Sequence, residues 1–376
     1  MENGPISKVD IAEKLGLTLV TVNQITNNLI KKGILVQEGV AESSGGRRAG
    51  LYAVNAAAFY VVGINIGIHY VSFAVDNLRM ETIYTDSIRL NVKSSPQDVT
   101  RLICGKINQV LQIQSITKTK LLGIGVTLPG LVDGEKGQVL LLPNMPGWES
   151  FPLKEVLQNE FQTYVSIEKD IYGSLIYLKN RKMLTGSNAM LFAIKGGIGA
   201  AVLLNGKPYR GENGIAGEIG HSLFQVSGDG NDESDTSFES YASDYGIIDK
   251  VKTKKSAQLT VEELNGLDLT YIINSCQAGD VTCKEVLLEA AGYVGIMLSN
   301  AIKFYDPKCI IIYSRWIKEV PEALAKIEKI IQNSNTLITM NTEIRVIYQN
   351  DIYLEGAVTI VFEHMLESIV DNPLVE

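Results

Sequence analysis

Short apolar segments alternate with longer helical patterns through most of the chain, from Phe59 onward. The apolar segments are typical of buried strands, and the stretches between them carry apolar residues at helical spacing. The expected strands span residues 60–67, 70–76, 121–126, 165–168, 190–194, 200–204, 309–313 and 343–348, and the expected helices span 96–113, 171–182, 283–304 and 321–332. This alternation predicts an α/β fold, and such folds bind ligands in a crevice at the strand ends.

The first fifty residues show a different pattern, two short helices joined by a glycine. Ser7 followed by Asp10 is an N-cap signature, Gly16 ends the first helix, and Thr18 caps a second helix that stops at Gly33. The second helix is expected to bury Val22, Ile25, Leu29 and Ile30 and to expose Thr21, Asn23, Gln24, Asn27 and Asn28. Two short helices with a tight turn predict a helix-turn-helix, whose second helix can enter a DNA major groove.

Two strands expected at 34–36 and 51–54 make this module a winged variant. Between them a glycine-rich turn carries Arg47 and Arg48, which suit phosphate or minor-groove contact. The alternative is a small helical bundle with a solvated basic surface. Few residues precede Ser7, so either the chain begins late, or dimerisation and the following domain complete the core. The predicted DNA-binding residues are Thr18, Thr21, Asn23, Gln24, Asn27, Asn28, Arg47 and Arg48.

The overall charge of −8 hides an asymmetry that matters for nucleic-acid binding. Residues 1–50 carry six basic and five acidic side chains, so the acidic excess lies entirely in the rest of the chain. No apolar run is long enough for a transmembrane helix, and no secretory signal is present. The four cysteines are scattered without a CxxC pair. We therefore expect a reduced, cytoplasmic protein without membrane contact, disulfides or a thiolate metal site.

Two glycine-rich segments in the second half are candidates for ligand contact. The segment 195–199 lies between two expected strands, where its amides suit a phosphate, although glycines serve tight hairpins equally often. The segment 211–221 holds Glu218 and His221 three residues apart among glycines, a spacing that suits hydrogen bonds to sugar hydroxyls. A structural role for this histidine is the alternative. Asn205 and Gly206 predict a type I′ hairpin turn.

An ordered set of motifs resembles the ROK family, which groups sugar-responsive bacterial repressors with related sugar kinases. The set comprises residues 6–48, 63–67, 128–133, 143–148 and 217–221. The resemblance implies a winged helix followed by a two-lobed, actin-like sugar-kinase (ribonuclease H-like) fold, in a homodimer or tetramer. It implies a DNA-binding domain at 1–55, a first lobe at 56–170 and a second lobe at 171–376, with the C-terminal helix returning to the first lobe.

The kinase motifs of that family are altered here. Asn65 stands where the phosphate-loop aspartate is expected, and Ile68 and His69 replace its glycine–threonine pair. The segment 313–316 replaces the glycine pair of the adenosine loop. The run 228–237 lacks the cysteines that join His221 in the family's zinc site, so this acidic run is either a solvated loop or a calcium site. We expect neither ATP–magnesium nor zinc as a cofactor.

The resemblance also assigns ligand residues. Asp170 matches the kinase base, and Glu239 matches a sugar-contacting glutamate. Lys169 replaces an asparagine, which favours an acidic or phosphorylated sugar unless the lysine pairs with Glu168 or Asp170. The implied ligand-binding residues are Asn144, Lys169, Asp170, Glu218, His221 and Glu239.

These features together predict a sugar-responsive transcriptional regulator, a repressor by family habit, whose body senses a carbohydrate without catalysis. Its expected partners are operator DNA that is pseudo-palindromic or A·T-rich, a sugar or sugar derivative, and a second copy of the chain. An active ATP-dependent sugar kinase with a DNA-binding domain is the alternative. A constitutive DNA-binding protein that has lost its sugar response is a third hypothesis.

Overall fold

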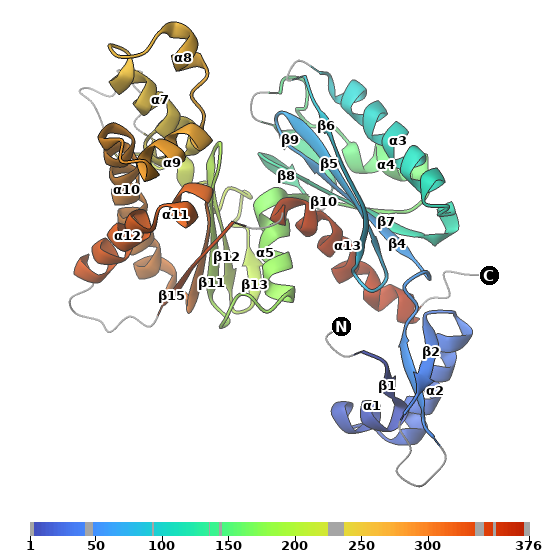
Figure 1. Ribbon diagram of the computed structural model, residues 1–376. Helices are drawn as coiled ribbons and strands as arrows, with labels where there is room; N and C mark the ends of the chain where they lie inside the picture. Colours follow the sequence, from blue (N-terminus) through green and yellow to red (C-terminus); the bar gives the residue numbers. More distant parts are fainter. Residues whose placement is uncertain are drawn as a thin grey trace. The chain divides into compact units, whose positions relative to one another are not determined.

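The computed structural model describes residues 4–41, 48–91, 94–134, 136–142, 145–224, 237–334, 342–348 and 351–371. The chain forms two compact units, Met1–Ser174 with Ile352–Glu376, and Leu175–Asp351. Figure 1 shows the elements of both units. The chain passes from the first unit to the second within α5 (Asp170–Asn180), four residues beyond the boundary expected at residue 170. The first unit contains the winged helix, the first sheet and helix α13 (Ile352–Asp371).

The N-terminal module is the predicted helix-turn-helix with a wing of two strands, and a third strand, which was not predicted, completes the wing's sheet. Its elements are β1 (Ile6–Ser7), α1 (Lys8–Leu15), α2 (Leu19–Lys31), β2 (Leu35–Val40) and β3 (Gly50–Val54), and the sheet order is β1-β3-β2. The Ser7 hydroxyl accepts a hydrogen bond from the Asp10 amide, and Thr18 accepts one from the Thr21 amide, so both helices are capped as predicted. Gly16 ends α1 in the left-handed region with φ +64°.

The predicted buried face of α2 was partly wrong. Val22 is buried as expected, but Ile25 is 44% exposed, and Leu29 and Ile30 are half-buried. Thr26 is buried instead, because its hydroxyl donates to the Val22 carbonyl at 2.7 Å and so satisfies its own polar group within the helix. The error arose because the spacing of apolar residues predicts the buried face of a helix only where neighbouring helices or strands cover that face.

The first large sheet has the strand order β10-β7-β4-β5-β6. Its strands are β4 (Tyr60–Ile66), β5 (Tyr70–Asn77), β6 (Thr82–Arg89), β7 (Leu121–Leu128) and β10 (Tyr164–Lys169), and a small ribbon is formed by β8 (Leu131–Asp133) and β9 (Gln138–Leu141). Strand β6 was not anticipated, because its exposed and half-buried residues alternate and most of its exposed residues are polar. Helices α3 (Pro96–Ile113) and α4 (Leu153–Phe161) pack on one face of the sheet around Trp148.

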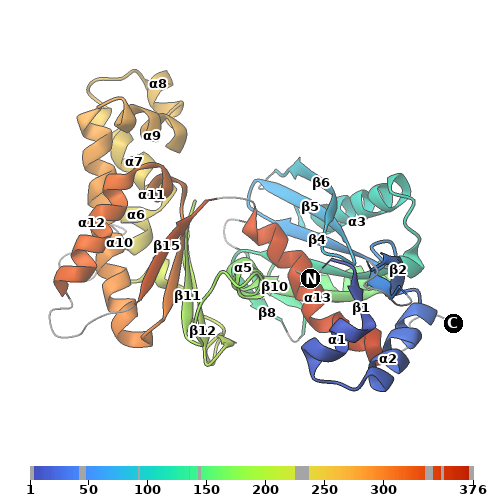
Figure 2. The ribbon, with the colours of Figure 1, turned by 60° about the horizontal axis from the view of Figure 1, so that its bottom comes forward.

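Helix α13 covers the opposite face of this sheet (Figures 1 and 2), where glycines allow two backbones to approach closely. A Cβ atom on Gly125 of β7 would lie 1.7 Å from the Ala357 carbonyl oxygen, and one on Gly63 of β4 would lie 2.5 Å from a Val358 methyl group. The Thr127 hydroxyl also donates to the Tyr353 carbonyl at 2.8 Å. The C-terminal helix is therefore fixed to the first sheet by shape and by a buried hydrogen bond.

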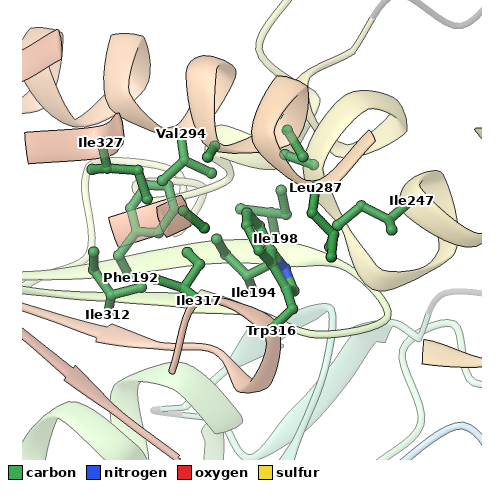
Figure 3. Close-up of a cluster of buried hydrophobic side chains, with 14 of the residues drawn as sticks. Phe192, Ile194, Ile198, Ile247, Leu287, Val294, Ile312, Trp316, Ile317 and Ile327 are labelled. Atoms are coloured by element: carbon green, nitrogen blue, oxygen red, sulfur yellow. The ribbon is translucent and has the colours of Figure 1, made fainter. Parts of the chain in front are cut away.

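The second unit is a five-stranded sheet with most of its helices on one face. The strands are β11 (Ala189–Ile194), β12 (Ile198–Leu204), β13 (Lys207–Tyr209), β14 (Cys309–Tyr313) and β15 (Glu343–Ile347), in the order β13-β12-β11-β14-β15. The helices are α6 (Phe238–Ala242), α7 (Asp244–Lys255), α8 (Val261–Asn265), α9 (Leu269–Gln277), α10 (Val281–Tyr305), α11 (Arg315–Glu319) and α12 (Pro321–Ser334). Figure 3 shows how Phe192 and Ile312 of the sheet meet Leu287, Val294 and Ile327 of the helices in one apolar core. Asn205 and Gly206 form the predicted hairpin turn, both at positive φ.

The wing is joined to the first sheet through the turn between β5 and β6. Arg79 in this turn donates from Nε to the Val54 carbonyl of β3 at 2.6 Å and forms an ion pair with Glu38 of β2. The Leu78 amide donates to the Ala56 carbonyl at 3.2 Å. One side chain of the sheet therefore contacts both strands of the wing.

We expect Gly125→Ala to destabilise the first unit by about 3 kcal/mol or more, because the added methyl group would overlap the α13 backbone. Gly105→Ala is the matched control, since Gly105 lies in α3 with nothing within 4 Å of its Cβ position. Replacing glycine by alanine in an open helix should stabilise the chain by about 0.5–1 kcal/mol. Chemical denaturation of both variants checks the prediction, and an unchanged midpoint for Gly125→Ala would contradict the close packing.

Candidate DNA-binding and effector sites

Helix α2 presents its polar residues to solvent, as a DNA-reading helix requires. The exposed residues among the predicted DNA contacts are Thr18, Thr21, Gln24, Asn27, Asn28 and Arg48, and Asn23 is half-buried. Thr18 and Thr21 hydroxyls also contact each other at 2.8 Å. Arg47 lies outside the described residues. Amide and hydroxyl side chains of this kind form the hydrogen bonds that distinguish base edges in the major groove.

Asn27 of α2 has a side-chain partner on the other helix of the module. The Lys8 ammonium of α1 donates to the Asn27 side-chain oxygen at 2.7 Å, and the same ammonium lies 4.9 Å from the centre of the Tyr52 ring. This contact links both helices to the wing. Sequence spacing gave no sign of it, since the two residues are nineteen positions apart.

The predicted ligand residues fall in different units. Lys169 ends β10 and Asp170 begins α5, both in the first unit, whereas Glu218, His221 and Glu239 belong to the second unit. The Lys169 side chain is buried, and one Asp170 carboxylate oxygen accepts a hydrogen bond from the Ile171 amide at 2.7 Å. Asn144 lies outside the described residues.

Asn65, which stands in place of the expected aspartate, forms a hydrogen bond between two strands of the first sheet. Its side-chain nitrogen donates to the Thr127 hydroxyl of β7 at 3.1 Å, and that hydroxyl in turn donates to α13. His69 lies exposed in the short turn to β5, where the Gly67 amide donates to the Tyr70 carbonyl. A neutral amide in this position offers magnesium a weaker ligand than a carboxylate does.

The glycine segment after β11 is the turn of an antiparallel hairpin. Ile194 pairs with Ile198, and the glycines between them pack against side chains: a Cβ on Gly197 would lie 2.9 Å from a Glu239 carboxylate oxygen. The same oxygen accepts a hydrogen bond from the Ile198 amide at 2.8 Å. An anionic carboxylate on this amide opposes a phosphate at the same place, because like charges repel.

The second glycine segment lies directly on strand β12. The Ala200 amide donates to the Gly217 carbonyl at 2.8 Å, and a Cβ on Gly217, at φ +89°, would lie 1.9 Å from the Ala200 carbonyl. This contact places Glu218, which is half-buried, next to the exposed His221 in a short 3-10 turn (Ile219–His221). The glycines are therefore required by close backbone contact, and they leave the histidine accessible.

No group of three histidine, cysteine, aspartate or glutamate side chains within the described ranges is arranged to hold a metal ion. Cys276, Cys283 and Cys309 are buried in the second unit, and Cys104 is half-buried in α3. The chain thus offers His221 no thiolate partner among its described neighbours, so the donor set does not fit zinc. The acidic run 228–236 lies outside the described residues.

The segment after β14 is closed by packing. Ser314 caps α11, and Trp316 lies fully buried in the core with its ring against the apolar cluster of Figure 3. Arg315 donates to Glu319 at 2.9 Å and to Thr270 at 2.8 Å. The bulky residues at this strand end therefore serve the fold.

A buried carboxyl group, which the sequence analysis did not single out, begins α7 close to these strand ends. The Asp244 amide donates to the Lys195 carbonyl at 2.8 Å, and its Oδ1 atom is buried without a hydrogen-bond partner among the described residues. Burial raises the pKa of Asp244 from 3.8 to about 7, although the charges of Lys195 and Arg315 act in the opposite direction. Little in the sequence indicated this buried carboxyl group, because a serine followed by an aspartate is also typical of an ordinary helix N-cap.

Asp244 should make the second unit less stable as the pH rises. The pKa of Asp244 is higher in the folded state than in the unfolded state. Its carboxyl group therefore contributes fully to the free energy of unfolding below about pH 3.8, and this contribution is lost as the pH rises through about 7. Asp244→Asn removes this titration. We expect the variant to gain about 2 kcal/mol of stability relative to the parent chain between pH 5 and pH 8.

Thermal or chemical denaturation at the two pH values measures this difference. Asp249→Asn is the matched control, because Asp249 lies exposed on the same helix. An equal pH dependence for the Asp244→Asn variant and the parent chain would show that this carboxyl group keeps its ordinary pKa.

None of the described helices combines the length and apolar character needed to cross a bilayer. A winged helix joined to a two-sheet body with this topology defines a class of DNA-binding proteins built on a sugar-kinase-like fold. Residues 61–365 match the ROK family, and residues 1–36 match the winged helix-turn-helix DNA-binding family. The chain belongs to the ROK family.

Known proteins resemble this chain in sequence and in fold. The chain is similar to a xylose repressor from Caldicellulosiruptor bescii, with 28% identity over 83% of this chain and 80% of the relative. It is also similar to the DNA-binding transcriptional dual regulator NagC of Escherichia coli, with 26% identity over 99% and 92% of the two chains. A solved ROK family transcriptional regulator, a homologue of the E. coli MLC protein, has the same fold, with a TM-score of 0.79, 22% identity and coverage of 99% and 96%.

Proposed function

We propose that this chain is a sugar-responsive DNA-binding repressor whose kinase-like body senses a carbohydrate without phosphorylating it. The observation that carries the proposal is the exposed polar face of α2, capped at Thr18 and followed by a wing, on a body of the ROK family. The names of the relatives support it, since both the xylose repressor and NagC regulate transcription. Operator DNA, a sugar and a second copy of the chain are the proposed partners.

Three contacts support a body without catalysis. Asn65 bonds to Thr127 where a kinase of the family needs an acid, Glu239 binds the Ile198 amide in the glycine turn, and Trp316 fills the strand end after β14. Each of these three side chains contacts other parts of the folded chain. We therefore propose that neither ATP–magnesium nor zinc acts as a cofactor.

Glu218 and His221 are the proposed sugar contacts in the second unit, because a half-buried glutamate and an exposed histidine lie three residues apart on a glycine segment that packs closely on β12. A sugar changes DNA binding only through different affinities for two arrangements of the protein. A coupling of about 1–3 kcal/mol is typical of such regulators. The Arg79 contacts with β2 and β3 offer a route by which the first large sheet restrains the winged helix.

An active sugar kinase is the second candidate, because Asp170 is retained at the start of α5. A hexose and pentose panel distinguishes the two. We expect a sugar that raises the melting temperature to release the chain from its operator, with no sugar-dependent ADP formation by the parent chain or by Asp170→Asn. A sugar at about 100 times its dissociation constant should add about 2.7 kcal/mol of stability. ADP formation that Asp170→Asn abolishes would establish the kinase instead, and the absence of any stabilising sugar would favour a constitutive DNA-binding protein.

The wing arginines should contribute electrostatic contacts that do not depend on base sequence. Each phosphate contact adds about 0.9 to the slope of log K against log salt. The double variant Arg47→Ala/Arg48→Ala is expected to lower that slope by about two and to weaken binding to specific and non-specific DNA alike. Fluorescence anisotropy at several salt concentrations measures it. Lys207→Ala, which removes one positive charge from β13 of the second unit, is the control, and an unchanged slope in the double variant would remove these arginines from the interface.

A further inference from the structure

One apolar side chain lies on the outward face of helix α2, among the polar residues that face DNA in the proposed function. Val22 and Thr26 define the buried side of the helix. Since each residue turns the helix by about 100°, the side opposite them is centred on Gln24, with Val20 one turn before it and Asn28 one turn after it. All three side chains are exposed. Val20, Gln24 and Asn28 form the outward stripe of α2.

Val20 is 77% exposed, the largest exposed fraction of any large apolar side chain in the winged helix. It neither caps the helix nor packs in the module, and a β-branched residue is a weaker helix former than alanine. The fold therefore gains nothing from a valine at this position. Val20 occupies the second position of α2, and the N-terminal residues of a recognition helix are those that contact base edges.

The neighbours of Val20 indicate which base it meets. Asn27 is held by the Lys8 ammonium at 2.7 Å, so its side-chain oxygen already has a donor, whereas Gln24 lies at the centre of the outward stripe. Glutamine binds adenine through two hydrogen bonds, and an apolar side chain in the major groove contacts the 5-methyl group of thymine. One helical turn advances about 5.4 Å along α2, and a base pair advances about 3.4 Å along DNA.

We propose that Val20 reads the 5-methyl group of a thymine in each operator half-site, one or two base pairs from an adenine bound by Gln24. The inference rests on the proposed DNA-binding function and adds the chemical group that is recognised. Each half-site of the operator then contains a thymine whose methyl group, and not its hydrogen-bonding edge, is selected.

Replacement of thymine by deoxyuridine tests this directly, because the substitution removes the methyl group and keeps the base pair. The operator is first selected from a random duplex library with the intact chain, and each thymine is then replaced in turn. We expect one thymine per half-site at which deoxyuridine weakens binding by about three- to fivefold, the effect of one buried methyl group. Val20→Ala should bind the thymine and deoxyuridine operators with equal affinity.

Two matched variants separate the contact from general effects on the helix. Gln24→Ala should lose the preference for adenine and keep the sensitivity to deoxyuridine. Ile25→Ala, which removes an apolar side chain of the same helix that lies away from the outward stripe and is 44% exposed, should bind both operators like the parent chain. Melting temperatures of the three variants report whether the module stays folded.

The outcomes are distinguishable. Specific binding with no thymine sensitive to deoxyuridine, or a Val20→Ala variant that stays as sensitive as the parent chain, overturns the inference and leaves the proposed function intact. Failure of the intact chain to select any sequence overturns the proposed function and this inference together.

Discussion

The close contact between helix α13 and the glycines of the first sheet determines how the first unit closes. Backbone atoms of Ala357 lie where a side chain on Gly125 would be, so the last helix of the chain must return to the first sheet. Thr127 joins the same contact, since it donates to α13 and accepts from Asn65. Asn65, which by the family resemblance stands at the phosphate-loop aspartate of the kinases, is thus part of the packing that closes the first unit.

The second unit likewise uses for packing two positions at which the family resemblance implies ligand contact. Glu239 binds the amide of the glycine turn, and Trp316 fills the end of strand β14. Polar groups buried in a protein are normally hydrogen-bonded, so a carboxylate that satisfies an amide also removes that amide from ligand binding. The proposed function, a body that binds a sugar without reaction, rests on contacts of this kind.

Much of the fold was predictable from local patterns. The caps at Ser7 and Thr18, the helix 96–113 and the turn at Asn205 follow from short-range chemistry, and the structure confirms them. Strand β6 and the burial of Thr26 were not predictable, because an edge strand with polar residues has no apolar signature and Thr26 satisfies its hydroxyl within its own helix. For the candidate sites, the sequence predicted which residue types would be present. It did not predict the hydrogen-bond and ion-pair partners of those residues.

Local sequence features identify the class of this protein, because capped helices, a wing and an ordered set of glycine motifs are encoded by neighbouring residues. The partners of individual residues depend on the folded chain: Glu239 binds a backbone amide, the Asp244 Oδ1 atom is buried without a hydrogen-bond partner among the described residues, and Val20 stands outward on α2. The physical reason is that burial and charge environment depend on residues far apart in the chain. Lys8 and Asn27, or Arg79 and Glu38, meet only after folding.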